Sequence, residues 1–279
     1  MRSSRLALGA AVAFAALSPA AAHAATTPTA SSLRADAGSY SLSRTVYADS
    51  ATPGFGAATV FAPSGTSGQT FGVVAFAPGF TETTSSVSWL AQKVASFGFV
   101  TIAFNVNNTF TDFPTSRATQ LLAALDFVTS TSNERTLADA TREAVVGHSM
   151  GGGATLEASR QRPALKAAVG LEPWNPGISY SDVTVPQLEI GAQWDFIAPV
   201  ANNAKTFYNS LPSTTPKVLA VLSGAGHFAS NSPSARVGAA TVAWLKRYVD
   251  GDTQYAPFIC GSHTAIKDSE LSSFASSSC

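Results

Sequence analysis

The sequence contains few cysteines, few histidines and few charged residues, and each shortage excludes a class of protein. Its 279 residues include two cysteines and four histidines, and charged residues make up 12% of the chain. Basic and acidic residues number 17 each, with no basic stripe, so we expect no nucleic-acid partner. The cysteines have only His263 near them, which is too few ligands for a metal site. We expect neither a metal nor a cofactor.

A long apolar run is present only at the N-terminus. There, an alanine-rich run over residues 6–21 follows two arginines and ends in a small-x-small pattern, Ala22-His23-Ala24. This arrangement is typical of a secretory signal peptide over residues 1–24, whereas a membrane anchor would need a longer run and a charged stop. We therefore predict a secreted protein that is cleaved after Ala24 and has no membrane anchor.

The rest of the chain is predicted to be one domain. Residues 25–38 are rich in threonine, serine and alanine and indicate a flexible lead-in, and residues 39–279 are enough for one large core. The two cysteines of an exported protein, Cys260 and Cys279, predict one disulfide. In the chain-entropy model, this bond would stabilise the fold by about 3 kcal/mol.

Apolar, β-rich runs alternate with helical patterns along this domain. Eight runs are predicted strands, at residues 44–48, 57–63, 71–79, 99–106, 143–149, 165–173, 186–193 and 217–224. Helical patterns cover residues 85–98, 115–130, 200–212 and 235–252, and another helix starts near Met150. This alternation predicts an α/β fold with a mostly parallel sheet flanked by helices. The first strands have no helix between them and are predicted to form an antiparallel edge.

One motif in this pattern indicates chemistry. Gly147-His148-Ser149-Met150-Gly151 fits G-x-S-x-G, between a predicted strand and a predicted helix. A nucleophile elbow has this sequence and this setting, because glycines on both sides let the serine project from a tight turn. A phosphate-binding loop is excluded because no G-K-[ST] follows. A plain strand-to-helix turn remains as an alternative.

A serine nucleophile needs a base, and three histidines follow the predicted signal peptide. His148 is adjacent to the serine, but on a sharp elbow its side chain should point away, so we predict a packing or hydrogen-bonding role. His263 lies inside the predicted disulfide loop. His227 follows a strand among small residues and comes last in the order Ser…acid…His, so we predict that it is the base.

The acid that orients the histidine should lie between Ser149 and His227, at the end of a strand. The candidates are Glu172, Asp182, Glu189 and Asp195. Asp195 follows a strand directly and is the predicted acid, and Glu172, at the end of the preceding strand, is the alternative.

The oxyanion of a tetrahedral intermediate needs two donors. One is predicted to be the N–H of Met150, the residue after the nucleophile. The other should come from the loop after the third strand, from Phe80 or Thr81, where Gly79 eases the turn.

These residues stand in blocks that resemble one family. The blocks are GHSMGGG, PGFTE, EPWNPG, VTVPQLEIGAQWDFIAPV, GAGHFA and VAWLKRYVDGDTQYAPFIC. From about Ser39 to Cys279 the chain is similar to the bacterial cutinase-type polyester hydrolases, the PET hydrolase and cutinase group of the α/β-hydrolase superfamily. The resemblance implies an α/β-hydrolase fold with a sheet of about nine strands, an open groove and no lid.

The resemblance also implies roles for individual residues. It implies a triad of Ser149, Asp195 and His227 and oxyanion donors at Phe80 and Met150. It further implies that Phe80 and Trp174 flank the acyl part of the substrate, with Thr81, Met150 and Ile197 lining the same groove. Such aromatic faces can stack on an aromatic ester or cover an aliphatic chain.

Two departures from the family pattern matter. Phe80 stands where many relatives have tyrosine, so a contact from a ring hydroxyl is missing. Some thermophilic relatives bind calcium through three acidic positions, which here are Asp182, Ser223 and Gly251. Because only one acid is left, we predict little stabilisation by calcium.

The sequence therefore predicts a secreted serine esterase. We expect it to hydrolyse polyesters, such as cutin or PET-like polymers, and short-chain esters through an acyl-enzyme, as a monomer. The alternative enzyme is a lipase or small-ester esterase without polymer activity, and a non-catalytic binding protein on a hydrolase scaffold is a third hypothesis.

Overall fold

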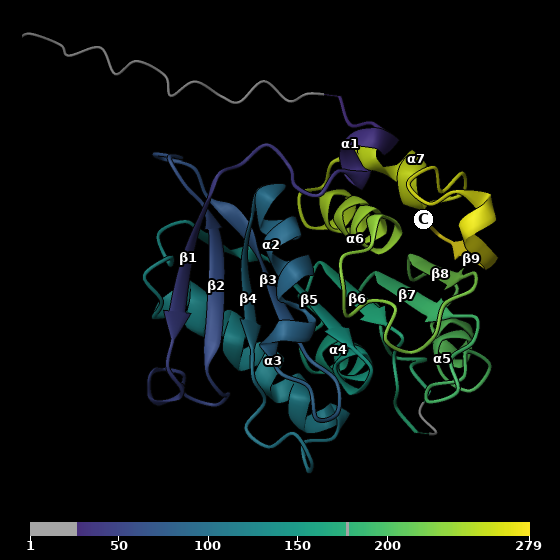
Figure 1. Cartoon of the computed structure of the whole chain (residues 1–279), viewed down its shortest axis with the longest axis horizontal. Coiled ribbons are helices and arrows are strands. Elements are labelled where there is room, and N and C mark those ends of the chain that lie inside the picture. Colours follow the sequence, from purple (N-terminus) through teal and green to yellow (C-terminus); the bar gives the residue numbers. More distant parts are fainter. Residues whose placement is uncertain (1–26, 177–178) are drawn as a thin grey trace, which may run out of the picture.

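The computed structural model describes residues 27–176 and 179–279. The predicted signal peptide, residues 1–24, lies outside this part of the chain. One mixed sheet forms the centre, in the order β1-β2-β4-β3-β5-β6-β7-β8-β9 from left to right in Figure 1. Its strands are β1 (Leu42–Tyr47), β2 (Ala58–Pro63), β3 (Phe71–Ala77), β4 (Phe99–Phe104), β5 (Ala138–His148), β6 (Ala167–Leu171), β7 (Gln187–Ala192), β8 (Lys217–Leu222) and β9 (Leu271–Ser277).

Seven helices accompany the sheet within the described ranges. They are α1 (Ala30–Arg34), α2 (Ser88–Ser96), α3 (Pro114–Ser130), α4 (Met150–Gln161), α5 (Ala204–Ser210), α6 (Ala235–Tyr248) and α7 (Ala256–Ile259). Nine strands with flanking helices confirm the predicted α/β-hydrolase architecture. The helix predicted over 200–212 is shorter than expected, because residues 200–203 form a turn before α5.

The middle of the sheet is parallel and its edges are antiparallel. Strands β4, β3, β5, β6, β7 and β8 pair in parallel, whereas β1–β2, β2–β4 and β8–β9 pair antiparallel. The antiparallel edge predicted at the start of the sheet is confirmed. Strand β9 was not among the eight predicted strands, because it is serine-rich and only partly buried at an edge, and it therefore has no apolar run.

The core lies on both faces of the sheet. Alternate residues of one strand contact different layers: Val74 packs with residues of α2 and α6 such as Trp244, whereas Val73 packs with residues of α3 and α4 such as Leu121. All six or seven residues of the central strands β3 and β4 are buried, which accounts for their continuous apolar sequence. The two helical layers thus fix the parallel strands, and with them the loops at their carboxyl ends.

The N-terminal segment is more ordered than the sequence indicated. The predicted flexible lead-in contains helix α1, which Thr29 caps and whose Leu33 is fully buried in the core. Arg34 binds both carboxylate oxygens of Glu270 at 2.8 Å. A buried leucine and a bidentate ion pair hold this segment against the C-terminal part of the domain.

The predicted disulfide is present between Cys260 and Cys279. It joins the residue after α7 to the residues that follow β9, so it secures the antiparallel strand that completes the sheet. Within residues 27–176 and 179–279, none of the helices combines the length and apolarity that a bilayer crossing requires.

Candidate active site

Ser149 occupies the sharp turn between a strand and a helix. Strand β5 ends at His148, helix α4 begins at Met150, and the serine between them has φ 53° and ψ −117°. A positive φ in a residue with a side chain costs about 1–3 kcal/mol, and such strain persists only where the surroundings fix it. The turn places the hydroxyl of Ser149 at the start of α4, where helix N–H groups lack intrahelical partners.

The glycines beside Ser149 are required by close backbone contacts. A Cβ atom on Gly147 would lie 2.1 Å from the carbonyl oxygen of Gly151, and one on Gly151 would lie 2.4 Å from that of Ala77. No side chain fits at these distances, so the strand and the helix can cross only with glycine at both positions. The turn therefore has the backbone geometry that a nucleophile elbow requires, with Ser149 between a strand and a helix.

Ser149, His227 and Asp195 form a hydrogen-bonded chain. Nε2 of His227 lies 2.9 Å from Oγ of Ser149, and Nδ1 lies 2.8 Å from Oδ2 of Asp195. Because an ionised carboxylate only accepts, Nδ1 of His227 carries a proton, which leaves Nε2 to accept the proton of the serine hydroxyl. The three residues lie on loops after β5, β7 and β8, which share one edge of the sheet.

Asp195 is held in place by its own loop. Its Oδ1 accepts hydrogen bonds from the N–H groups of Ile197 at 2.9 Å and Ala198 at 2.7 Å. Burial acts to raise the pKa of this carboxyl, but the bonds from His227 and from these N–H groups outweigh it and lower the pKa. Asp195 is therefore ionised at neutral pH, as an acid that orients a histidine must be.

The other candidate acids lie elsewhere. Glu172 is buried and accepts a hydrogen bond from Oγ of Ser230. Glu189 lies buried inside strand β7, and burial raises its pKa well above the ordinary value. Asp182 binds Arg160 through both carboxylate oxygens, at 2.8 and 3.0 Å. Within the described residues, no group of three or more His, Cys, Asp or Glu side chains could hold a metal ion.

The two remaining histidines serve other contacts. His148 binds the carbonyl oxygen of His227 and the carboxylate of Glu82, which confirms the predicted hydrogen-bonding role. The ring of His263 packs against that of Phe274, with the ring centroids 4.0 Å apart and the planes inclined by 45°.

The loop after β3 lies against the elbow. Arg117 of α3 is fully buried and donates from Nη1 to the carbonyl oxygens of Pro78 and Gly79, at 3.0 and 3.1 Å. Among the described residues, no hydrogen-bond acceptor pairs with the N–H of Phe80. The N–H of Met150 belongs to the first turn of α4 and has no intrahelical partner. Among the described residues, the loop and the helix thus each have one backbone N–H without a protein acceptor.

Large apolar side chains are exposed around these loops. Of the eight that are exposed in the described ranges, seven follow the carboxyl ends of parallel strands: Phe80, Phe110, Phe113, Trp194, Phe196, Ile197 and Phe228. Phe80 and Phe110 contact each other edge to face, with centroids 5.9 Å apart. Exposed apolar side chains gathered at one edge of a globular protein favour a binding surface there.

Other predicted groove residues lie at the same edge. Trp174, half-buried in the loop after β6, donates its backbone N–H to the carbonyl oxygen of Ser149 at 2.8 Å. Thr81 is exposed and has φ 57°.

Sequence reasoning missed part of this surface and one polar residue. Trp194 and Phe196 flank Asp195, and Phe228 follows His227, so aromatic neighbours of the triad residues were the available signal. Glu82, which contacts His148, gave no such signal, because the two residues are 66 positions apart.

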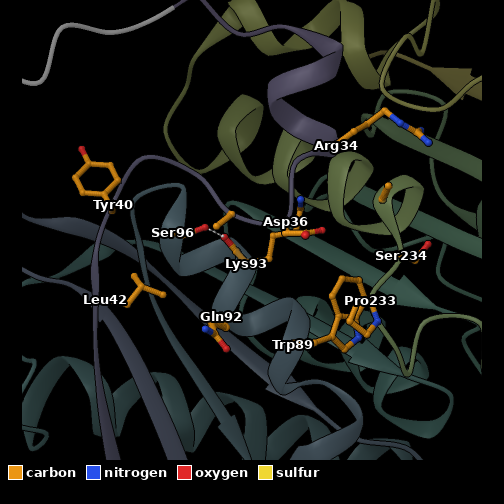
Figure 2. A pocket seen from close by; sticks show the side chains of 12 residues that line it. Arg34, Asp36, Tyr40, Leu42, Trp89, Gln92, Lys93, Ser96, Pro233 and Ser234 are labelled. Atoms are coloured by element: carbon orange, nitrogen blue, oxygen red, sulfur yellow. Dashed lines mark hydrogen bonds between the residues drawn. The ribbon is translucent and has the colours of Figure 1, made fainter.

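A separate cavity lies beside helix α2. It has a volume of about 490 Å³ and lies between the segment of Asp36, helix α2 and the residues before α6 (Figure 2). Trp89 lines it and donates from Nε1 to the carbonyl oxygen of Ser230 at 2.8 Å. Its lysine, Lys93, is bound to the carbonyl oxygen of Ala35. None of the residues of the candidate site lines this cavity.

Comparison with known proteins agrees with this fold. The profile of the family described as PET hydrolase-like matches residues 18–279. The chain is 46% identical to a bis(hydroxyethyl) terephthalate hydrolase of Streptomyces coelicolor over 233 residues, 84% of this chain and 75% of the relative. It is 47% identical to cutinase est1 of Thermobifida alba over 242 residues (86% and 81%) and 48% identical to cutinase 1 of Thermobifida cellulosilytica over 235 residues (84% and 88%). The chain therefore belongs to the PET hydrolase-like family and is a carboxylic-ester hydrolase.

Proposed function

We propose that this chain is a secreted serine esterase that hydrolyses polyesters, including aromatic ones, and short-chain esters. The observation that carries the proposal is the chain of hydrogen bonds from Ser149 through His227 to Asp195, set among exposed apolar side chains. Polyester hydrolysis is favoured because the relatives are named cutinases and a bis(hydroxyethyl) terephthalate hydrolase.

The first half-reaction forms an acyl-enzyme. Oγ of Ser149 attacks the ester carbonyl carbon while its proton passes to Nε2 of His227, and Asp195 stabilises the resulting imidazolium. The N–H groups of Phe80 and Met150 donate to the oxyanion of the tetrahedral intermediate, where the loss of one such donor typically costs about 3 kcal/mol. As the intermediate collapses, Nε2 returns its proton to the departing alcohol oxygen.

The second half-reaction releases the acid. A water molecule gives a proton to Nε2 of His227 and attacks the acyl carbon, and the same donors bind the second oxyanion. Collapse breaks the bond to Oγ, which takes back the proton from Nε2. The enzyme is restored, and one ester bond has been replaced by an alcohol and an acid.

The substrate is expected to lie across the exposed apolar side chains. Phe80, Thr81, Trp174 and Ile197 are proposed to contact the acyl part, since aromatic and branched side chains bind apolar polymer segments without a deep pocket. We propose that the protein acts as a monomer outside the cell. Export is supported by the sequence of residues 1–24 and by the disulfide, which is typical of oxidising compartments.

The test is product release from an amorphous polyester film and from a soluble short-chain ester, by wild type and Ser149→Ala. We expect both activities in wild type and neither in the variant. Hydrolysis of the short ester without release from the film would replace the proposal with a small-ester esterase. A strong preference for long acyl chains would replace it with a lipase, and full activity of Ser149→Ala would refute the mechanism.

A further inference from the structure

His148, the residue before the proposed nucleophile, has both ring nitrogens bound to acceptors. Nδ1 lies 3.0 Å from the carboxylate of Glu82, and Nε2 lies 2.8 Å from the carbonyl oxygen of His227. Because a carboxylate and a carbonyl oxygen only accept, each ring nitrogen must carry a proton. His148 is therefore an imidazolium ion, although its side chain has no exposed surface.

Glu82 supplies the negative charge that a buried imidazolium needs. Its carboxylate is contacted only by donors: Oε2 accepts from the N–H of Gly79 at 2.7 Å and from His148, and Oε1 accepts from Nδ2 of Asn231 at 2.6 Å. Burial acts to raise the pKa of Glu82, but these bonds and the charge of His148 lower it to about 2. Glu82 is thus ionised and paired.

The other titratable groups around His148 do not replace Glu82. Glu172 lies 3.7 Å from Nε2, but burial raises its pKa to about 8, so at neutral pH it is mostly protonated. The ring of His227 has its centroid 5.0 Å from that of His148, and its nitrogens bind Ser149 and Asp195. Arg117 and Asp195 are charged but bind other groups. Arg117 binds the carbonyl oxygen of Pro78 in the loop after β3, called the oxyanion loop below, and Asp195 binds His227.

One carboxylate consequently links three segments of the proposed site. Gly79 precedes the donor Phe80, His148 precedes the nucleophile, and Asn231 belongs to the loop of His227. Hydrogen bonds to charged groups are about twice as strong as neutral ones, so these contacts resist separation of the segments.

We propose that Glu82 is a positioning residue of the esterase reaction, whose carboxylate fixes the oxyanion loop at Gly79 and the loop of His227 against the elbow at His148. This inference rests on the proposed function. Glu82 acts through these loops and not on the substrate, so its loss should affect the chemical step and leave substrate binding largely unchanged.

The atoms of Glu82 suggest a sharp test, because both of its oxygens accept. Glutamine has the same shape but only one acceptor, so in Glu82→Gln the amide N–H₂ must face a donor, either Asn231 or the pair Gly79 and His148. At least one link is lost. Asn231→Asp places an acceptor opposite that N–H₂, so the double variant restores the link with its polarity reversed.

We expect Glu82→Gln to lower kcat for a soluble ester by about 10- to 100-fold, with KM within about twofold, since small displacements of reacting groups cost this much. Asn231→Asp alone should also lower kcat, because the new carboxylate of residue 231 would lie against that of Glu82 and the two would repel each other. The double variant should exceed Glu82→Gln by about tenfold, as expected of directly coupled residues. Wild-type kcat in Glu82→Gln, or no recovery in the double variant, would overturn the proposal.

Two controls complete the experiment. Glu134→Gln changes another buried carboxylate, which accepts hydrogen bonds from Thr45 and Tyr47 of strand β1. This variant should leave kcat unchanged. If Glu82→Gln does not fold, Asn231→Ala, which removes only the link to the loop of His227, should lower kcat severalfold, and an unchanged kcat there would overturn the proposal. Ser149→Ala separates the two hypotheses: if it stays active, the proposed function fails, whereas normal Glu82→Gln beside an inactive Ser149→Ala refutes only the positioning role.

Discussion

The ring of Phe228 packs edge-on against the ring of His227, with centroids 5.2 Å apart and planes inclined by 77°. Phe228 is exposed, whereas His227 is buried. The proposed base therefore lies at the boundary between a buried polar network and an exposed apolar surface. A polymer segment that covers Phe228 would exclude water from the neighbourhood of His227, which strengthens the electrostatic contacts that the reaction uses.

The apolar surface should matter for a polymer and not for a small ester. Phe196 is 85% exposed beside Asp195, so Phe196→Ser removes binding area without opening the core. We expect release from a polyester film to fall about tenfold, since an aromatic side chain contributes on the order of 1.5–3 kcal/mol when covered. Hydrolysis of a soluble short-chain ester should stay within about twofold.

Val46 offers a matched control for this measurement. It is 59% exposed on the edge strand β1, which is separated by β2, β4 and β3 from strand β5 before Ser149, so Val46→Ser removes exposed apolar area elsewhere on the protein. Equal losses of film activity in Phe196→Ser and Val46→Ser would contradict a specific binding surface.

Amide variants of Asp195 and Glu172 can decide which of the two acids orients His227. Asp195→Asn should lower kcat by about 10⁴-fold, the scale seen when an amide leaves the histidine of such a triad in the wrong tautomer. Glu172→Gln should change kcat at pH 7 by less than about tenfold, because Glu172 has no hydrogen bond with His227. The reverse ranking in steady-state kinetics would make Glu172 the acid.

The buried Glu172 predicts how stability depends on pH. The pKa of Glu172 is about 8 in the folded chain, whereas its ordinary value is 4.5. Between pH 4.5 and about pH 8 the folded state therefore keeps a proton that the unfolded state releases. This contribution to stability is complete below about pH 4.5 and is lost as the pH rises through about 8. Glu172→Gln cannot ionise and lacks this loss.

Denaturant unfolding at pH 5 and pH 8.5 tests this expectation. Wild type should lose more unfolding free energy between the two pH values than Glu172→Gln, by on the order of 1–4 kcal/mol. Groups that do not interact with Glu172 titrate equally in both proteins, so their effects cancel in the comparison. Identical losses would mean that Glu172 is ionised in the fold.

Reduction of the disulfide should destabilise the domain without removing the site. The bond between Cys260 and Cys279 spans 19 residues, and a loop of this size contributes about 3 kcal/mol in the chain-entropy model. We expect Cys279→Ser to lower Tm by several degrees. Activity at 25 °C should persist, because Ser149, His227 and Asp195 lie outside the closed loop; complete inactivity of folded Cys279→Ser would contradict this.

Calcium should change thermal stability very little. Asp182 has both oxygens bound to Arg160, and the other two positions that are acidic in some thermophilic relatives are Ser223 and Gly251 here. We expect Tm to shift by less than about 2 °C in millimolar calcium, since an ion without a complete site binds the folded state weakly and so stabilises it little. A rise of many degrees would show that other groups bind the ion.

The sequence was informative where local chemistry decides the structure. The elbow at Ser149 and the order of Ser149, Asp195 and His227 could be predicted, because glycine spacing and strand ends are local features. Strand β9 could not, since a half-exposed edge strand needs no apolar run. Helix α1 was not predicted for a related reason: with Leu33 as its one buried residue, it has no repeating apolar pattern at helical spacing.

The polar network was beyond sequence reasoning. Glu82, His148 and Asn231 are far apart along the chain and meet only because β3, β5 and β8 end at the same edge of the sheet. A single glutamate in a loop belongs to no periodic pattern and to no motif with a fixed spacing, so the sequence gives no sign of such a contact. Only the folded positions of the loops reveal that its two oxygens accept from three donors.

The hydrogen bond from the N–H of Trp174 to the carbonyl oxygen of Ser149 limits how this enzyme can be engineered. A side chain on Gly153 would lie 2.2 Å from the carbonyl oxygen of Trp174, so the loop after β6 and the start of α4 are fitted backbone to backbone. Loop exchange between homologues treats such segments as interchangeable parts. Here, residues 172–176 belong with the elbow and should be transplanted together with it, whereas Trp194 and Phe196 can be redesigned one side chain at a time.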